Sequence, residues 1–256
     1  MTEPDPKADL RYYLQAAREA LLWKLDGLSE YGIRRPLTPT GTNLLGLIKH
    51  VASVEIGYFG DTFGRPFGEP LPWWEDGAEL NADMWATADE SRDQIVALYR
   101  RAWAHSDATI DALELDAIGR VPWWPAERAE VTLHRILVHV IAETNRHGGH
   151  ADIVRELIDG AVGLRDGNDN MAPGDQAWWA NYRSRLELVA QQAGRGRPSR
   201  IHDQLPAVSG GPGQTSCSKP PLAVRRTSSS GAMTRPQRAH LCPAARSSLS
   251  SKSTSV

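Results

Sequence analysis

Apolar residues recur at steps of three and four along several long stretches of this chain, and that helical period constrains the fold more than any other feature. Each stretch pairs an apolar stripe with a polar face, which is typical of helices that bury one side. No stretch shows the strict alternation of a half-buried strand. The sequence therefore predicts an all-α fold, a bundle of four long helices with an extra C-terminal helix. The predicted helices cover Asp9–Tyr31, Leu44–Phe59, Thr87–Leu113, Ala129–Asp159 and Asp175–Gln192.

Local residues predict where these helices begin and end. Thr40 or Thr42 is the expected N-cap of the second helix, and Thr87 with Glu90 forms a capping box for the third. Gly160 is expected to end the fourth helix, since glycine readily takes the left-handed conformation found there. The connection between the second and third helices is long and irregular, and such a connection in a compact domain is often functional.

Composition changes sharply after about Gln192, which predicts a globular body at residues 1–193 and a disordered tail at residues 194–256. The tail is rich in Ser, Pro, Gly and Arg and holds too little apolar surface to offset the entropy of ordering. It carries 10 Lys and Arg residues against one acid, Asp203. Removing the tail from the totals of 29 basic and 31 acidic residues leaves 19 basic and 30 acidic residues in the body. The tail is either a genuine segment or the product of a shifted reading frame.

The distribution of charge and cysteine disfavours several classes of function. An acidic body is a poor partner for a phosphate backbone, so we expect no binding of nucleic acid by the folded body. Cys217 and Cys242 both lie in the tail, so the body offers neither a disulfide framework nor a thiolate ligand or nucleophile. Because Met1–Leu22 does not look like a signal segment and no long apolar run occurs, we expect a soluble, cytoplasmic protein with no membrane partner.

A carboxylate and an imidazole four residues apart in the fourth predicted helix suggest a metal site. Glu143 and His147 project from one face of that helix and could hold a divalent ion together. His50, beside the apolar stripe of the second helix, is the natural third ligand. These donors suit zinc, nickel, iron or manganese, and three protein ligands leave positions open for a water or a substrate.

The neighbouring residues leave alternatives open. Two histidines and a glutamate at helical spacing are also common on solvated helix faces. His139 and His150 lie one turn from Glu143 and His147 respectively, so either could replace or support a ligand. The pair Gly148–Gly149 costs about 2 kcal/mol in a helix relative to alanines, which indicates close approach of a ligand or backbone, or tight helix packing.

Tryptophans mark two further places along the chain. Trp123 and Trp124 lie in a predicted loop, where bulky aromatic side chains either roof a pocket or plug the end of the bundle. Trp178 and Trp179 are expected to anchor the last helix to the core.

The body resembles the DinB/YfiT-like superfamily of metal-binding four-helix bundles, which includes the mycothiol-dependent maleylpyruvate isomerases and thiol S-transferases. The resemblance rests on the segment Leu47–Glu55 of the second helix and on Glu143–Asp152 of the fourth. It spans about Asp9 to Ala161 and leaves the tail outside.

The resemblance implies a ligand set. In that superfamily a histidine of the second helix and two residues four apart on the fourth hold the metal, which implies His50, Glu143 and His147 here. Many members have histidine at the position of Glu143, whereas the mycothiol-dependent isomerases are similar to this chain in having glutamate. His150 falls where many members have glutamine, which implies a neighbour of the site and not a ligand.

The activity implied is that of a divalent-metal-dependent thiol transferase. The metal, zinc before the others, would activate a low-molecular-weight thiol such as mycothiol for attack on a small electrophile. Two alternatives remain at this point, a non-catalytic, metal-binding, stress-related protein and a metal-dependent hydrolase that uses the same site. Dimers are common among the relatives, so a homodimer is a further expectation.

Overall fold

The structure, a computed structural model, describes residues 5–195 and confirms the all-α class for them. The predicted tail lies outside the described residues from position 196 on. A single two-stranded antiparallel hairpin accompanies the helices, which the sequence did not indicate. The elements are α1 (Pro6–Trp23), α2 (Glu30–Arg34), α3 (Leu44–Glu55), α4 (Arg92–Ala112), β1 (Ile118–Arg120), β2 (Glu130–Thr132), α5 (Leu133–Asp159) and α6 (Gln176–Arg195). A π-helical turn at Ile56–Gly60 and 3₁₀ turns at Asp61–Phe63 and Pro72–Trp74 follow α3.

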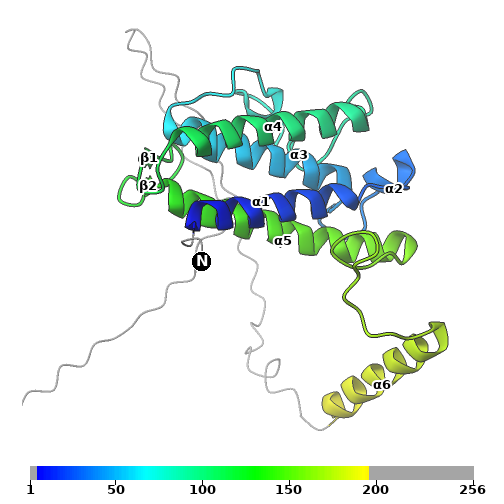
Figure 1. Cartoon of the computed structure of the whole chain (residues 1–256). Helices are drawn as coiled ribbons and strands as arrows, with labels where there is room; N and C mark the ends of the chain where they lie inside the picture. The colour runs from blue at the N-terminus through cyan, green and yellow to red at the C-terminus, as the bar shows by residue number, and fades with distance from the viewer. Residues whose placement is uncertain (1–4, 196–256) are drawn as a thin grey trace, which may run out of the picture. The chain divides into compact units, whose positions relative to one another are not determined.

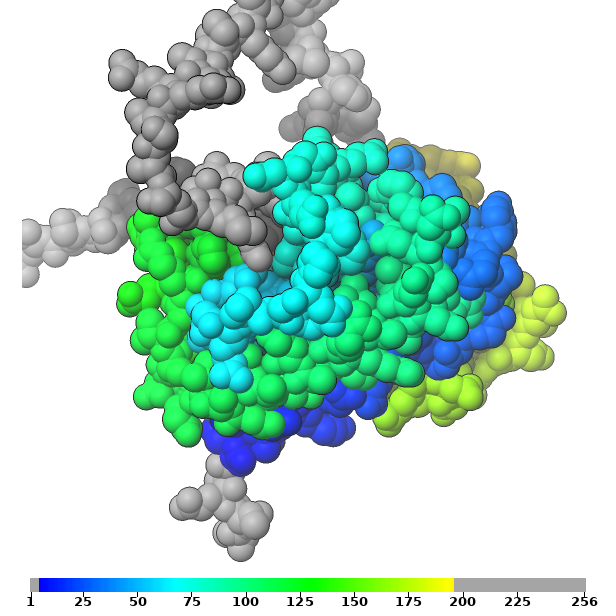
Figure 2. Space-filling model, turned by 90° about the horizontal axis from the view of Figure 1, so that it is seen from above, coloured from blue at the N-terminus to red at the C-terminus, as the bar shows by residue number. Residues whose placement is uncertain are grey.

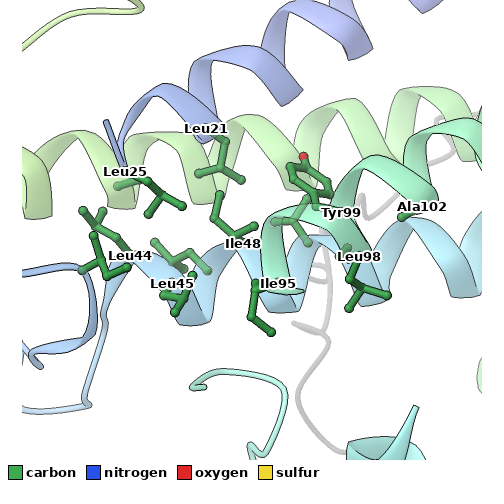
Figure 3. Close-up of a cluster of buried hydrophobic side chains, with 14 of the residues drawn as sticks. Leu21, Leu25, Leu44, Leu45, Ile48, Ile95, Leu98, Tyr99 and Ala102 are labelled. Atoms are coloured by element: carbon green, nitrogen blue, oxygen red, sulfur yellow. The ribbon is translucent and has the colours of Figure 1, made fainter. Parts of the chain in front are cut away.

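The four long helices α1, α3, α4 and α5 lie side by side as the expected DinB-like bundle (Figure 1). α1 packs along α5, and α3 packs against both α4 and α5. The second and fourth predicted helices are therefore neighbours, as a shared site would require. In Figure 3, Leu44 and Ile48 of α3 follow the same direction as Ile95 and Ala102 of α4, so these two helices run parallel.

Two parallel neighbours need a connection that returns along the bundle. Residues 64–91 make this return between α3 and α4. The returning segment, drawn in cyan to teal, lies on the face of the bundle seen in Figure 2. This long connection therefore lies against α3, and it turns out to hold one of the site's side chains.

The core consists of two clusters of buried apolar side chains. Both clusters join α1, α3, α4 and α5, the first around Ile48 and Tyr99 (Figure 3) and the second around Phe59 and Leu137. Both clusters use apolar positions of the helical period. Burial of these stripes at roughly 25 cal/mol per Å² is the main force that sets α3 against α5.

Several predicted helix ends are wrong, each because of the residues close to that end. α1 ends at Trp23 and not at Tyr31, since the chain turns through Gly27 with a φ of 73°. α3 is capped by Asn43, whose side chain accepts from the amide of Gly46, and not by a threonine.

The starts of the next two helices also differ from prediction. α4 begins after a capping box of Ser91 and Gln94. Glu90 does accept from the amide of Thr87, but no helix begins at that point. α5 starts at Leu133, because the residues just before it pair with β1; its end at Gly160, with a φ of 78°, confirms the prediction.

The described chain separates into two compact units, one containing residues 5–170 and one that begins at Met171 and carries α6. None of the residues of α6 is buried. Within this unit Trp178 and Trp179 contact each other and Tyr182, and their role as anchors of the last helix to the core stays a prediction. The boundary at residue 193 remains a prediction.

A buried ion pair ties α1 to α3 and α4. Arg18 donates to Glu55, with Nη2 2.7 Å from Oε2, and also to Asp107, with Nη1 2.9 Å from Oδ1. Arg18 and Glu55 are both buried, and burial raises the pKa of the Glu55 carboxyl while the Arg18 guanidinium opposes that rise. Either charge would be costly without the other.

Replacing Arg18 by methionine is expected to lower the free energy of unfolding by about 3–5 kcal/mol, because Glu55 then stays buried without its partner. Urea unfolding measures the change. The exposed Arg11–Asp111 pair provides the control, since Arg11→Met should cost less than about 1 kcal/mol. The double variant Arg18→Met/Glu55→Leu should recover much of the loss; an Arg18→Met protein as stable as the control would contradict this account.

Candidate functional site

The three predicted ligands converge from two helices. His50 lies on α3, and Glu143 and His147 lie one turn apart on α5. The rings of His50 and His147 face each other edge to face, with their centroids 4.7 Å apart. Nε2 of His147 is 3.7 Å from Oε2 of Glu143. Their side chains are 18%, 23% and 10% exposed for His50, Glu143 and His147, so the cluster is near the surface but mostly covered.

The electrostatics of the pair on α5 favour a neutral imidazole beside an ionised carboxylate. Burial lowers the pKa of His147, against the opposing effect of Glu143. The neighbouring His147 imidazole lowers the pKa of Glu143, although burial opposes that shift. A neutral imidazole and a carboxylate are the forms that ligate metals.

The fit of this cluster to a metal can be judged from its donors. Nδ1 of His147 is buried and has no hydrogen-bond partner among the described residues. Two imidazoles and a carboxylate are a donor set that zinc and its neighbours accept. As the side chains stand, however, no group of three His, Cys, Asp or Glu residues within 5–195 is arranged so that it could hold a metal ion. The donors therefore fit in chemistry, and closing them on one ion requires side-chain rotation.

A fourth polar residue, absent from the predicted site, joins this cluster. Oδ2 of Asp83 is 2.8 Å from Nδ1 of His50, and the Asp83 side chain is buried. Asp83 belongs to the connection between α3 and α4, where no periodic pattern fixes the position of a residue. Its only signal in the sequence was that this connection is unusually long for a compact domain.

The connection is fastened to α3 through residues that directly follow Asp83 and through Glu90. Asn43 donates its side-chain amide to the carbonyl of Met84, and Lys49 donates to the carbonyl of Trp85 and to Glu90. Gly46 makes the close approach possible, since a Cβ there would lie 1.8 Å from the Met84 carbonyl oxygen. Asp83 is thus held against α3 by contacts that do not involve His50.

His139 lies in an aromatic cluster one turn before Glu143. Its ring packs edge to face on Tyr58 and Trp124, with centroids 4.6 and 5.4 Å apart. Trp124 donates its indole N–H to the Tyr58 hydroxyl at 3.2 Å, and Trp123 packs on the Tyr58 ring. Tyr58 lies in the π-helical turn after α3, a feature that often marks functional sites. His139 is thus beside the cluster of predicted ligands, without a direct contact to them.

The remaining neighbours have simpler surroundings. His150 is exposed, and its ring lies 5.5 Å from that of His147. An added Cβ at Gly148 or Gly149 would meet nothing within 4 Å, so tight helix packing is not the reason for these glycines, and no other part of the described backbone approaches them. The faces of α5 that carry Gly148 and Gly149 are therefore open, and the approach of a ligand stays an alternative.

The fold and the site define the class of this protein, an all-α DinB-like bundle that gathers two histidines and a glutamate between α3 and α5. A family model described as Mycothiol-S-transferase matches residues 9–160, from α1 to the end of α5. Because that match covers more than half of the chain, the chain belongs to the mycothiol-S-transferase family. No curated protein matches the chain.

Gly46→Ala is expected to lower the free energy of unfolding by about 1–3 kcal/mol, because the new methyl group must displace the Met84 backbone. Gly149→Ala is the matched control. Its Cβ has open space in an exposed helix, so it should raise the free energy of unfolding by up to about 1 kcal/mol. Chemical unfolding measures both, and equal effects of the two substitutions would show that the approach of Met84 does not matter.

The metal-free protein is expected to lose stability as pH falls below about 6.5. Burial lowers the pKa of both His139 and His147, so the unfolded chain takes up protons at a higher pH than the folded chain. The full free energy of unfolding is therefore present above about pH 6.5 and declines below it.

Denaturant unfolding in the presence of a chelator, at steps from pH 8 to pH 5, measures this decline. The free energy of unfolding of the variant His139→Gln should decline less steeply with falling pH than that of the wild type. At pH 8, where His139 is not protonated in either state, the two proteins should differ only by the pH-independent change in stability that the substitution causes. An identical pH dependence of the two proteins would mean that His139 does not contribute.

Proposed function

We propose that this protein is a divalent-metal-dependent thiol S-transferase that activates mycothiol for attack on a small electrophile. The proposal is carried by one observation, the approach of the His50 and His147 rings to 4.7 Å from two different helices, with Glu143 beside them. Membership of the mycothiol-S-transferase family supports mycothiol as the thiol. Zinc is our first choice of metal for two imidazoles and a carboxylate, with nickel, iron and manganese as alternatives.

In this proposal His50, Glu143 and His147 hold the ion. When bound, the ion supplies the Lewis acidity that keeps a thiol ionised near neutral pH. Glu143 offsets part of the positive charge, and its ionisation is favoured by His147. Three protein ligands leave room for the sulfur.

The surroundings of the three ligands suit a small thiol and its acceptor. On one side, the faces of α5 at Gly148 and Gly149 are open, since no described atom would meet a Cβ there. On the other side, Tyr58, Trp123 and Trp124 form an apolar wall around His139. These rings would form the apolar side of a site for the thiol or its acceptor.

The location, the oligomeric state and the electrophile are less constrained by the structure than the metal site. No helix among residues 5–195 is long and apolar enough to cross a membrane. A cytoplasmic location and a homodimer remain predictions, as does the electrophile.

His147→Ala should abolish both metal retention and thiol transfer, because it removes a ligand whose buried nitrogen has no other partner among the described residues. Elemental analysis of the purified protein measures the metal, and consumption of mycothiol with a reactive acceptor measures transfer. His134→Ala, an exposed histidine on the same helix, is the control and should retain both properties.

The outcomes separate the proposal from its alternatives. Full metal content in His147→Ala would reject the ligand assignment. Metal bound by the wild type without any transfer of mycothiol to the acceptor would indicate a protein that only binds metal. Release of hydrolysed substrate at the same rate with and without thiol would indicate a hydrolase.

A further inference from the structure

The connection between α3 and α4 brings a carboxylate to the far side of His50. Asp83 is buried, and its Oδ2 lies 2.8 Å from Nδ1 of His50, while the ring of His147 packs against the same imidazole. We infer that Asp83 is a positioning residue, which fixes the tautomer and the ring orientation of His50 so that Nε2 is presented to a divalent cation. This inference rests on the proposed function, because it takes His50 as a ligand.

The chemistry of the contact decides which nitrogen carries the hydrogen. An ionised carboxylate accepts hydrogen bonds and donates none, so the inference takes Nδ1 of His50 as the donor across the 2.8 Å contact with Asp83. A neutral imidazole has one hydrogen, which leaves Nε2 bare and able to bind a metal. A carboxylate behind a ligating histidine also makes the imidazole a stronger base.

The position of Asp83 does not depend on His50. The residue that follows it, Met84, accepts from Asn43, and Trp85 accepts from Lys49. The missing side chain of Gly46 lets this part of the backbone lie directly on α3. The carboxylate is therefore fixed to the same helix as His50, and the imidazole turns to meet it.

A purely structural role for Asp83 makes a different prediction from a positioning role. Glu90 offers the comparison, because it anchors the same connection through Lys49, at 2.8 Å, without any contact to His50. Loosening of the connection by Glu90→Gln should leave the imidazole of His50 and its affinity for zinc unchanged. Loss of the carboxylate in Asp83→Ala should change both.

The first measurement needs no metal. Nitrogen NMR of the ¹⁵N-histidine-labelled, metal-free full chain at pH 8 reports which ring nitrogen of His50 carries the hydrogen. The Nδ1–H form is expected in the wild type and in Glu90→Gln, and a mixture of the two tautomers in Asp83→Ala. Asp83→Asn should restore the Nδ1–H form, since its side-chain carbonyl can still accept.

The second measurement is the affinity for zinc, by competition with a chelating dye. Asp83→Ala is expected to bind zinc 10–100-fold more weakly than the wild type, and Asp83→Asn to lie between them. Equal losses in Asp83→Ala and Glu90→Gln would overturn the inference, as would an unchanged tautomer in Asp83→Ala. A wild-type protein that binds no zinc would refute the metal site, and the role of Asp83 would fall with it. Zinc binding that is the same in the wild type and in Asp83→Ala would refute the role of Asp83 alone.

Discussion

The packing of α3 against α5 is the constraint on which the rest of this structure depends. It brings the ring centroids of His50 and His147 to 4.7 Å from each other. The packing itself is made by buried apolar side chains of the two helices, among them Ile48, Val51, Ala151 and Val154. A polar cluster alone could not hold two helices together, because its hydrogen bonds exchange with water at little net gain. The hydrophobic core therefore positions the site. The buried Arg18–Glu55 ion pair also fixes α1 against α3.

The long connection between α3 and α4 has two roles in this arrangement. Because α3 and α4 run parallel, the chain has to return along the bundle, and the returning segment covers one side of α3. At Gly46 it comes so close that no side chain fits between them. The same segment carries Asp83 to His50. A topological requirement of the fold thus places a carboxylate behind an imidazole of the candidate site.

Much of this arrangement could be predicted from the sequence, and the reasons for the failures are physical. The period of three and four residues indicated the long helices, and the spacing of Glu143 and His147 put them on one face, because both are properties of a single helix. Helix ends were less certain, since Asn43 and Ser91 compete with nearby residues as caps. Asp83 could not be found, because its place is set by contacts between distant segments.

X-ray absorption at the zinc edge, on the full chain loaded with one equivalent of zinc, tests the central claim most directly. The account predicts a first shell of two imidazole nitrogens and a carboxylate oxygen at about 2.0–2.1 Å, joined by one sulfur at about 2.3 Å when mycothiol is added. A shell without imidazole would contradict the ligand set of His50, Glu143 and His147. A shell that gains no sulfur in the presence of mycothiol would contradict the activation of the thiol by the metal.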